Sequence, residues 1–551
     1  MTAPTSASHS RRDTRRLHGG VATGERFAGL APEALRLLRE AGQCLTQNRL
    51  DEAEQALVGV SAFAPDHPEA LRLQATLHHL RGRRDEAIAL LRRALKQQPD
   101  DALIIHHLGA SLLQAGAMSE ALPLLRRACE LAPDLGSAWM NLGTALDMDA
   151  DFEMSHAAFQ RAVQCDPRHV PARIAYGNGL RALGRIADAA AQYRHAIEIN
   201  PDAVGAWAAL CDLKTVELRA DETVALQNLH RNPKLAERDR AVAGFALGKA
   251  LEDQQRYAQA LGVFNAANAV WRRESGWDRE AFTQFVDRVI DAFLVPRACA
   301  AEGTLGQQII FIASVPGSDS MLTEQILAAH SKVEGGGERR ELGITLDEES
   351  KRRRIAFPEW IAYATADDWE RLGWRYLELT ARWRQHKPTS TDLALTNWLY
   401  LGAARAMLPG AHFVNSRRDP LETAWSCFKQ LFLLPQPFAY DFEDIGAYWR
   451  DYDRLMCFWH AHYPGRIYDH IHEDLVADPE TQIRRMLDFC GLPFERACLR
   501  CHQSARAVGT ASAAQVGQPL HTDSTVSGHY GDLLDPLRRA LQLSGTRVGL
   551  R

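Results

Sequence analysis

The chain has 551 residues, a formal net charge of −5, 46% hydrophobic residues and 24% charged residues. This length exceeds what one hydrophobic core usually organises, so several domains are expected. The slightly acidic charge argues against a general nucleic-acid binder, whose domains are strongly basic, but it allows a local basic pocket for a small anion.

The first twenty residues contain four arginines with no apolar stretch after them, and no apolar run in the chain is long enough to span a membrane. A signal peptide and a transmembrane helix are therefore not expected. The ten cysteines are dispersed without a pairing rhythm, which is typical of a reduced protein. We expect a cytoplasmic location, with a transit peptide as the alternative because the N-terminus is rich in serine and arginine.

The first half of the chain repeats itself every 34 residues. The period is kept by prolines and by small residues, at Pro65, Pro99, Pro133, Pro167 and Pro201, at Ala53, Ala87, Ala121, Ser155 and Ala189, and at Gly109, Gly143 and Gly177. Each repeat is predicted to hold two helices that cross at the small residues, and proline ends the second helix because its ring cannot continue the hydrogen-bond ladder. A 34-residue period with these residue types resembles the tetratricopeptide repeat (TPR).

This resemblance implies a superhelical stack of helix pairs. Complete repeats are predicted at 34–67, 68–101, 102–135, 136–169 and 170–203, followed by a degenerate unit that contains Trp207 and by a further unit at 241–274. The concave surfaces of such stacks commonly hold peptide segments. The expected partner of this half is therefore a protein or peptide.

After a bridging helical segment near 275–300, the pattern changes to alternating strands and helices. A short apolar run, Gln308–Val315, is typical of a buried parallel strand. A tight turn at 316–320 and a helical stretch at 321–330 follow, a geometry that offers backbone N–H groups to an anion. Further strand-like runs at 411–415 and 465–470 predict a parallel α/β sheet. The turn lacks the Gly-Lys-Ser/Thr of a nucleotide-triphosphate P-loop, which disfavours a GTPase or ATPase.

Several segments of this half, read together, resemble a sulfotransferase domain of the kind found in protein-tyrosine sulfotransferases and after TPRs. The matching segments occur in family order, as FIASVPGSDSMLTEQILAAH, VEGGGERREL, HFVNSRRDPLETAWSCF, HEDLVADPETQIRRMLDFCGLPF and VGTASAAQVGQPL. The resemblance runs from about residue 307 to 530. It implies an α/β P-loop-like fold that uses 3′-phosphoadenosine-5′-phosphosulfate (PAPS) as the sulfuryl donor, without a metal.

The resemblance also implies roles for individual residues. Arg418 and Ser426 match the residues that bind the 3′-phosphate of PAPS, and Glu338 matches the proposed catalytic base. The remaining donor-binding residues are expected in the 5′-phosphosulfate loop and in the last matching segment, at Gly317, Ser318, Asp319, Ser320 and Ser512. Arg418 would form charge-assisted bonds with the phosphate, and Glu338 would accept the proton of the acceptor hydroxyl.

Several residues depart from the family pattern, among them Gly509 and Gly517, which stand where arginine is common. The family loop typically reads Pro-Arg-Ser-Gly-Thr-Thr, so Gly317 replaces an arginine and Asp319 brings a negative charge to an anion site. Leu393 stands where the family usually has lysine. A carboxylate beside a bound dianion is unfavourable by on the order of a few kcal/mol. The donor site is therefore weakened, rebuilt with other cations such as Arg339 and Arg340, or inactive.

Each proposed site residue also has a simpler interpretation. Arg418 could belong to a salt bridge at the start of a helix whose first residue is Pro420. Glu338 could be a solvated loop carboxylate, and Ser318 and Ser320 could cap the following helix.

The sequence therefore predicts a multidomain chain: a disordered tail at 1–30, an all-α TPR solenoid at 31–274, a helical linker at 275–306 and a sulfotransferase domain at 307–551. The predicted function is PAPS-dependent sulfation of a hydroxyl, tyrosine-like, on a protein or peptide that the repeats present. A glycan hydroxyl is another possible acceptor. The alternative is a non-catalytic TPR scaffold whose sulfotransferase fold has lost activity. Nucleic acid is not an expected partner.

Overall fold

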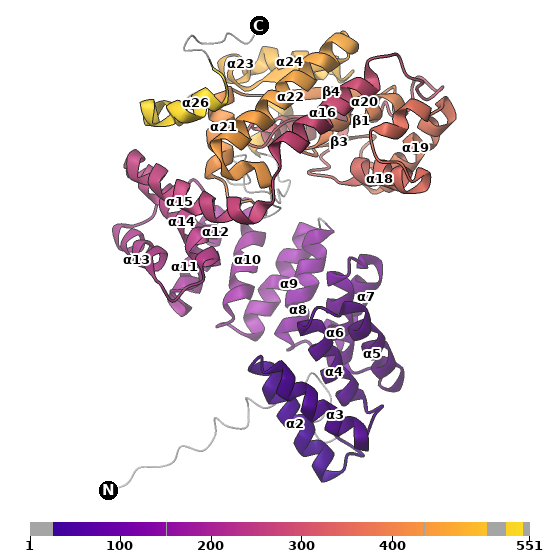
Figure 1. Ribbon diagram of the computed structural model, residues 1–551, viewed down its shortest axis with the longest axis vertical. Helices are drawn as coiled ribbons and strands as arrows, with labels where there is room; N and C mark the ends of the chain where they lie inside the picture. The colour runs from indigo at the N-terminus through magenta and orange to yellow at the C-terminus, as the bar shows by residue number, and fades with distance from the viewer. Residues whose placement is uncertain (1–25, 150, 433–435, 504–524, 544–551) are drawn as a thin grey trace. The chain divides into compact units, whose positions relative to one another are not determined.

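The computed structural model describes residues 26–149, 151–432, 436–503 and 525–543. The chain divides into two compact units, residues 1–203 and 204–551. Unit 1 is entirely helical where it is described, and unit 2 combines helices with a parallel sheet (Figure 1). This confirms the predicted fold class, a helical repeat region followed by an α/β domain. The domain boundaries at 31–274, 275–306 and 307–551 stay predictions.

Unit 1 consists of five helix pairs that follow one another along the chain. Their bounds are α2 Pro32–Thr46 with α3 Leu50–Phe63, α4 Pro68–Leu80 with α5 Arg84–Gln97, α6 Ala102–Gln114 with α7 Met118–Leu131, α8 Gly136–Met148 with α9 Phe152–Cys165, and α10 Val170–Ala182 with α11 Ile186–Ile199. The first helices of successive pairs, α2, α4, α6 and α8, contact one another. They therefore line one face of the stack.

The repeated glycines stand where the two helices of a pair approach closely. A Cβ atom added at Gly143 in α8 would lie 2.6 Å from the ring of Phe159 in α9. One added at Gly177 in α10 would lie 2.4 Å from the ring of Tyr193 in α11. Glycine at this position of the repeat thus lets a buried aromatic ring pack directly against the helix backbone.

Replacing Gly143 with alanine is expected to lower the free energy of unfolding of unit 1 by about 1–3 kcal/mol, because the added methyl group overpacks the contact with Phe159. Gly42→Ala in α2 is the control, since its Cβ would meet no atom within 4 Å. That change should raise the stability by about 0.5–1 kcal/mol by removing a helical glycine. Urea unfolding followed by far-ultraviolet circular dichroism measures both. Equal stability of the two variants would show that the crossing at Gly143 is not tight.

The polar contacts at the start of unit 1 involve a residue that the sequence places in the tail. Arg26 is 1% exposed and lies 3.2 Å from Glu69 and 2.9 Å from Asp101. These two carboxylates belong to α4 and to the residue that caps α6. Arg72 also pairs with Glu69. Arg26 is therefore anchored to the second and third helix pairs.

Unit 2 begins with helices that continue the pattern of the repeats. These are α12 Val204–Asp212, α13 Ala220–Arg231, α14 Glu237–Asp253, α15 Tyr257–Ser275 and α16 Arg279–Phe293. The predicted degenerate unit corresponds to α12 and α13, and the unit at 241–274 to α14 and α15. The predicted bridging helix is α16.

A five-stranded parallel sheet forms the centre of unit 2. Its strands, in the spatial order β2-β3-β1-β4-β5, are β2 Val333–Glu334, β3 Thr389–Asp392, β1 Ile309–Ala313, β4 His412–Arg417 and β5 Ile467–Ile471. All five residues of β1 are buried, as expected for a central strand covered on both faces. The register pairs Phe311 with Asp392 on one side and with Phe413 on the other.

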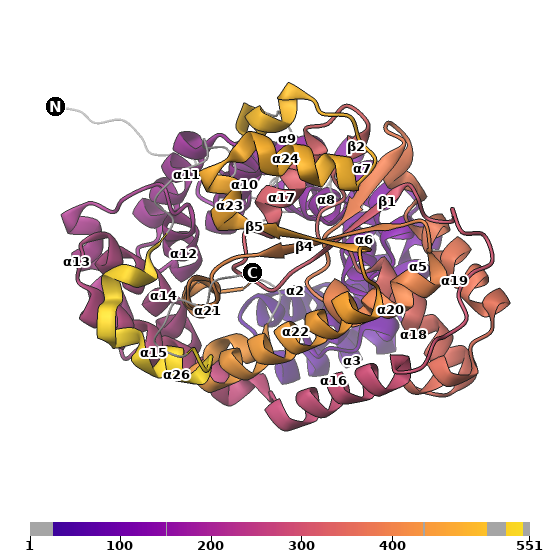
Figure 2. The same cartoon turned by 90° about the horizontal axis from the view of Figure 1, so that it is seen from above.

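Helices cover both faces of the sheet. They are α17 Ser320–Ala328, α18 Glu341–Arg353, α19 Ala366–Leu379, α20 Asn397–Met407, α21 Pro420–Lys429, α22 Phe442–His462, α23 His472–Ala477, α24 Pro479–Phe489 and α26 Asp535–Ala540, with short 3-10 segments η2 Glu359–Tyr363, η3 Ala381–Arg384, η4 Pro437–Tyr440, η5 Arg496–Gln503 and η6 Ser527–Leu534. In Figure 2, β4 and β5 run between α24 and α22. Ile310 and Ile312 share a core with α17 and α24, whereas Phe311 contacts Phe413 and Tyr376 on the opposite face.

The helices α14 and α15 are joined to α21 by buried polar contacts. Asn268 of α15 donates a hydrogen bond to the carbonyl oxygen of Phe428 at 2.9 Å. Lys429 donates to both carboxylate oxygens of Glu252 in α14, at 2.8 and 3.0 Å. The hydroxyl of Tyr530 in η6 donates to the same carboxylate at 2.9 Å. This helical pair is thus held against the α/β part of unit 2.

No helix in the described parts of the chain is both long and apolar enough to cross a membrane.

Candidate functional site

The candidate site lies at the carboxyl end of β1, where the order of the strands changes direction. From β1 the chain next adds β2 and β3 on one side of the sheet, and β4 and β5 on the other. Ligands of open α/β sheets bind at such switch points, beyond the carboxyl ends of the strands. Three predicted segments end here: the turn after β1, the loop after β2 and the segment after β4.

The turn after β1 presents the N-terminus of α17. Its N-cap residue, Asp319, makes no hydrogen bond from its side chain to the first turn of the helix. The hydroxyl of Ser318 donates to the carbonyl oxygen of Val315 at 2.8 Å. Ser318 therefore stabilises the turn rather than capping α17. The first N–H groups of a helix lack intrahelical partners, so this terminus can bind an anion.

Gly317 permits a close contact between this turn and α21. Its φ is +88°, and a Cβ atom there would lie 2.6 Å from the carbonyl oxygen of Thr423 and 3.2 Å from Cβ of Ser426. A residue with a side chain would be strained by the positive φ and would collide with the backbone. The fold therefore brings Gly317 and Ser426 together. It also gives a steric reason why the family's arginine is replaced here.

Asp319 forms an ion pair with the residue predicted to bind the 3′-phosphate. Its Oδ2 lies 3.0 Å from a terminal nitrogen of Arg418 and 3.4 Å from Nδ1 of His472. A second carboxylate, that of Glu422, lies 3.8 Å from Arg418 and accepts a hydrogen bond from the backbone N–H of Ser527 at 2.8 Å. Arg418 thus lies between two carboxylates. The simpler interpretation, that Arg418 forms a salt bridge at the start of a helix, explains its contact with Glu422 but not its contact with Asp319.

Glu338 lies in a glycine-rich loop that is anchored to α17 and β3. The N–H of Gly337 donates to Oε1 of Glu324 at 2.7 Å, and the hydroxyl of Thr391 donates to the same oxygen at 2.6 Å. The side chain of Glu338 reaches solvent, yet the surrounding protein atoms and the negative charge of Glu324 raise its pKa above the ordinary value of 4.5. A carboxylate with a raised pKa is a better proton acceptor near neutral pH than a fully solvated one.

The cations proposed as replacements, Arg339 and Arg340, make no described contact with the turn after β1. Arg339 is 5% exposed, and its guanidinium lies over the ring of Trp383 at 4.9 Å. Arg340 precedes α18 as its N-cap residue. Leu393, at the position of the family's lysine, is 1% exposed and packs in the core with α17. No described contact brings any of these side chains to Asp319.

Two residues of the site were not predicted from the sequence. Glu324 is fully buried in α17 and holds the loop of Glu338. His472 begins α23 and contacts Asp319. For Glu324, the only signal in the sequence was a glutamate in the apolar helical stretch that follows the turn at 316–320. The second had no local signal, because His472 is brought to the site only by the pairing of β5 with β4.

Other predicted features fall outside this arrangement. Ser512 lies outside the described residues. Among those that are described, no group of three or more His, Cys, Asp and Glu side chains is placed to hold a metal ion.

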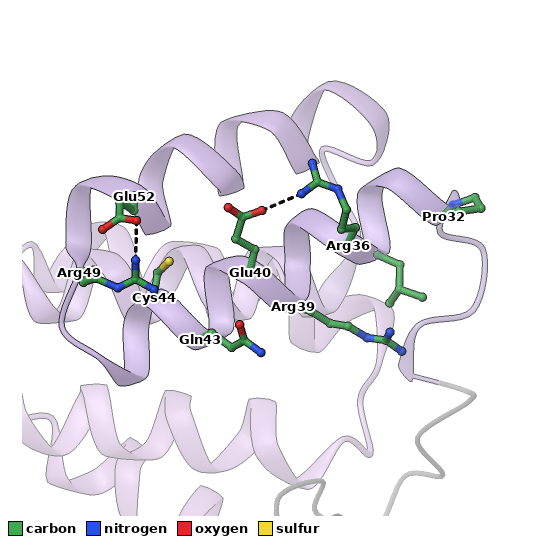
Figure 3. A pocket seen from close by; sticks show the side chains of 9 residues that line it. Pro32, Arg36, Arg39, Glu40, Gln43, Cys44, Arg49 and Glu52 are labelled. Carbon is green, nitrogen blue, oxygen red and sulfur yellow. Dashed lines mark hydrogen bonds and ion pairs between the residues drawn. The ribbon is translucent and has the colours of Figure 1, made fainter.

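A surface hollow of about 730 Å³ on α2 and α3 contains none of the predicted site residues (Figure 3). It is lined by Pro32, Leu35, Arg36, Arg39, Glu40, Gln43, Cys44, Arg49 and Glu52. Arg36 pairs with Glu40 at 3.0 Å, and Arg49 pairs with Glu52 at 2.6 Å. The hollow contains none of the residues that meet at the end of β1 and is therefore not the candidate site.

Comparison with known proteins supports the two-part architecture. Residues 309–496 match the model of the sulfotransferase family, and residues 44–112, 78–146 and 140–204 match tetratricopeptide-repeat models. Both parts of the predicted resemblance are confirmed by these matches.

The relatives are distant. An uncharacterised protein of Aquifex aeolicus is 29% identical over 375 residues, which cover 66% of this chain and 49% of that protein, so the chain spans about half the length of this relative. A putative protein-tyrosine sulfotransferase of Caenorhabditis briggsae is 24% identical over 229 residues, covering 40% of this chain and 80% of that protein. Among solved structures, MamA of Desulfovibrio magneticus RS-1 is similar over 32% of this chain and 99% of its own, with 23% identity and a TM-score of 0.27.

Proposed function

We propose that this chain, in which tetratricopeptide repeats precede a sulfotransferase-family domain, transfers a sulfuryl group from PAPS to a hydroxyl of a protein or peptide. The observation that carries the proposal is the convergence of three segments, each predicted separately, at the carboxyl end of β1. The turn at 316–320 would hold the 5′-phosphosulfate, Arg418 and Ser426 would bind the rest of the donor, and Glu338 would act on the acceptor.

In the proposed reaction, the acceptor oxygen attacks the sulfur of the donor. A new S–O bond forms while the bond between sulfur and the bridging phosphate oxygen breaks, which releases 3′,5′-adenosine bisphosphate. The carboxylate of Glu338 accepts the proton of the attacking hydroxyl. The N-terminus of α17 stabilises negative charge on the departing phosphate, as preorganised N–H groups do in other transfer reactions.

The acceptor is proposed to be a protein or peptide, tyrosine-like in its hydroxyl, because tetratricopeptide repeats are protein-interaction modules. The face formed by α2, α4, α6 and α8 is the proposed binding surface. Polar contacts join neighbouring helices of this face. Nδ2 of Asn141 in α8 lies 2.8 Å from Nε2 of His106 in α6, and Oγ1 of Thr76 in α4 lies 3.5 Å from Nδ1 of His107. We place the reaction in the cytoplasm because all ten cysteines are free thiols in the structure.

A non-catalytic scaffold is the second candidate, and one observation favours it. The ion pair between Asp319 and Arg418 uses the predicted phosphate ligand within the protein itself. If this pair never opened and no other group took over its role, the donor would not bind. The repeats would then be the functional part of the chain.

Calorimetric titration with 3′,5′-adenosine bisphosphate separates the two candidates. The enzyme is expected to bind this product in the micromolar range. Arg418→Ala should abolish the binding, because the change removes a cation from the site and leaves the negative charge of Asp319 without its guanidinium partner. Absence of binding up to millimolar concentrations would contradict the enzyme proposal and favour the scaffold. Thermal unfolding of both proteins verifies that the variant is folded.

A further inference from the structure

The contacts of Asp319 are those that a phosphate at this position would make. Its carboxylate lies 3.0 Å from Arg418, at the end of β4, and 3.4 Å from His472, which follows β5. The side chain of Arg418 is 9% exposed and that of Asp319 is 34% exposed. The ion pair is thus largely sheltered but remains open to solvent on the side of Asp319. The carboxylate of Asp319 therefore pairs with the guanidinium group of Arg418, which the proposed function assigns to the 3′-phosphate.

The charges around Arg418 do not favour a further dianion. Arg418 faces two carboxylates, Asp319 and Glu422, and a third, Glu473, accepts a hydrogen bond from the N–H of the adjacent Asp419 at 2.9 Å. Arg417, the neighbouring cation, is paired with Asp453 at 2.6 Å. A 3′-phosphate would have to displace the carboxylate of Asp319 or lie beside it, and like charges at such distances repel.

The two histidines at the end of β5, His470 and His472, add no compensating positive charge. Burial lowers the pKa of His472, and burial together with the neighbouring His472 lowers the pKa of His470 to about 4. The lowered pKa values favour the uncharged form of both imidazoles. Nε2 of His472 and both ring nitrogens of His470 are buried and have no hydrogen-bond partner among the described residues. Uncharged ring nitrogens and a carboxylate suit a hydroxyl group better than a phosphate.

Asp319 stands where the family pattern has glycine, and its backbone conformation is one that glycine adopts freely. Asp319 has a φ of +57°, in the left-handed region that glycine occupies freely and that aspartate tolerates better than most residues. The turn thus keeps the conformation that glycine favours, and the side chain is added on the side of Arg418. Replacing Asp319 with glycine should leave the turn intact.

We infer that Asp319 is a specificity residue of the donor site: its carboxylate takes the place of the donor's 3′-phosphate, so the site accepts adenosine 5′-phosphosulfates with a free 3′-hydroxyl as readily as PAPS. This inference rests on the proposed function and specifies the class of sulfuryl donor that the site would use. A similar exchange distinguishes NAD sites from NADP sites: an acidic residue binds the ribose hydroxyl of NAD, and an arginine binds the ribose phosphate of NADP.

The test compares adenosine 5′-monophosphate with 3′,5′-adenosine bisphosphate by calorimetry on the full-length chain. In the wild type, the two dissociation constants are expected within about threefold of each other. Asp319→Asn and Asp319→Gly remove the ion pair between Asp319 and Arg418, and the bisphosphate should then bind at least about tenfold more tightly than the monophosphate. Asp474→Asn is the matched control, because it removes an exposed carboxylate of α23 that makes no ion pair with Arg418.

Each outcome decides the inference. A wild type that binds the bisphosphate about a hundredfold more tightly than the monophosphate would overturn it while leaving the proposed sulfotransferase function in place. Equal preference in the wild type and in both Asp319 variants would also overturn it. Failure of both nucleotides to bind to any of the proteins would reject the proposed function as well. Thermal unfolding of Asp319→Gly identifies a variant that has not folded, in which case Asp319→Asn alone decides.

Discussion

Glu338→Gln is expected to reduce kcat for sulfuryl transfer by about 10²–10⁴-fold, the usual contribution of a general base. Glutamine keeps the size of the side chain but cannot accept the proton of the acceptor hydroxyl. Binding of 3′,5′-adenosine bisphosphate should not change, because Glu338 acts on the acceptor. Glu334→Gln, four residues earlier in β2, is the control and should retain activity. A loss of nucleotide binding in Glu338→Gln, or equal activity of the two variants, would contradict the assigned role.

The pH dependence of the reaction tests the same residue in another way. Because surrounding protein and the charge of Glu324 raise the pKa of Glu338, the carboxylate that accepts the proton is lost as pH falls through a value above 4.5. As the pH is lowered, the rate should therefore begin to fall at a higher pH than it would with an ordinary glutamate. Glu324→Gln removes one of the two causes and keeps an oxygen acceptor for Gly337. The acidic limb of kcat/KM should then move to lower pH, and an unchanged limb would show that Glu324 does not act on Glu338.

Lys429→Met is expected to lower the free energy of unfolding of unit 2 by about 3–5 kcal/mol, the cost of leaving the partner of a buried ion pair uncompensated. Lys429 and Glu252 have side chains that are only 16% and 10% exposed, and the hydroxyl of Tyr530 shares the carboxylate. Without the ammonium group, the charge of Glu252 would remain between α14 and α21. The helical pair and the α/β part of unit 2 would lose a main polar connection.

Urea unfolding followed by tryptophan fluorescence measures this effect, since all of the 12 tryptophans except Trp139 lie in unit 2. Lys351→Met is the control. Lys351 pairs with Asp347 on the surface of α18, with side chains that are 76% and 61% exposed, and its loss should cost at most about 1 kcal/mol. The double variant Lys429→Met with Glu252→Gln should recover much of the stability. Equal costs for the two lysine variants would show that the buried pair is not an important connection.

The accuracy of the sequence-based strand predictions depended on what each strand packs against. The strands β1, β4 and β5 were predicted close to their observed bounds, because each contains β-branched or aromatic residues that favour strands. The strand β3 was missed, since its sequence, Thr-Ser-Thr-Asp, is polar. These polar residues are buried only because partners reach them from elsewhere: Tyr376 donates to Asp392 at 2.6 Å, and Thr391 donates to Glu324.

The candidate site was predicted as a set of segments but not as an arrangement. The sequence identified Asp319 as a departure that places negative charge in an anion-binding loop. It did not reveal that this charge is paired, because Asp319 and Arg418 are 99 residues apart and His472 lies on a further strand-helix connection. Only the alignment of β1, β4 and β5 in one sheet brings Arg418 and His472 to within 3.4 Å of Asp319.

By itself, the sequence determined the features that short-range physics controls. The 34-residue period set the helix pairs, because proline and glycine act on the backbone where they stand, and the apolar runs set the central strands. The tertiary structure alone decided how charges are compensated: Asp319 by Arg418, and Glu252 by Lys429. The energy of a charge depends on which groups lie within a few ångströms of it in space, and in both pairs the partner comes from a distant part of the chain.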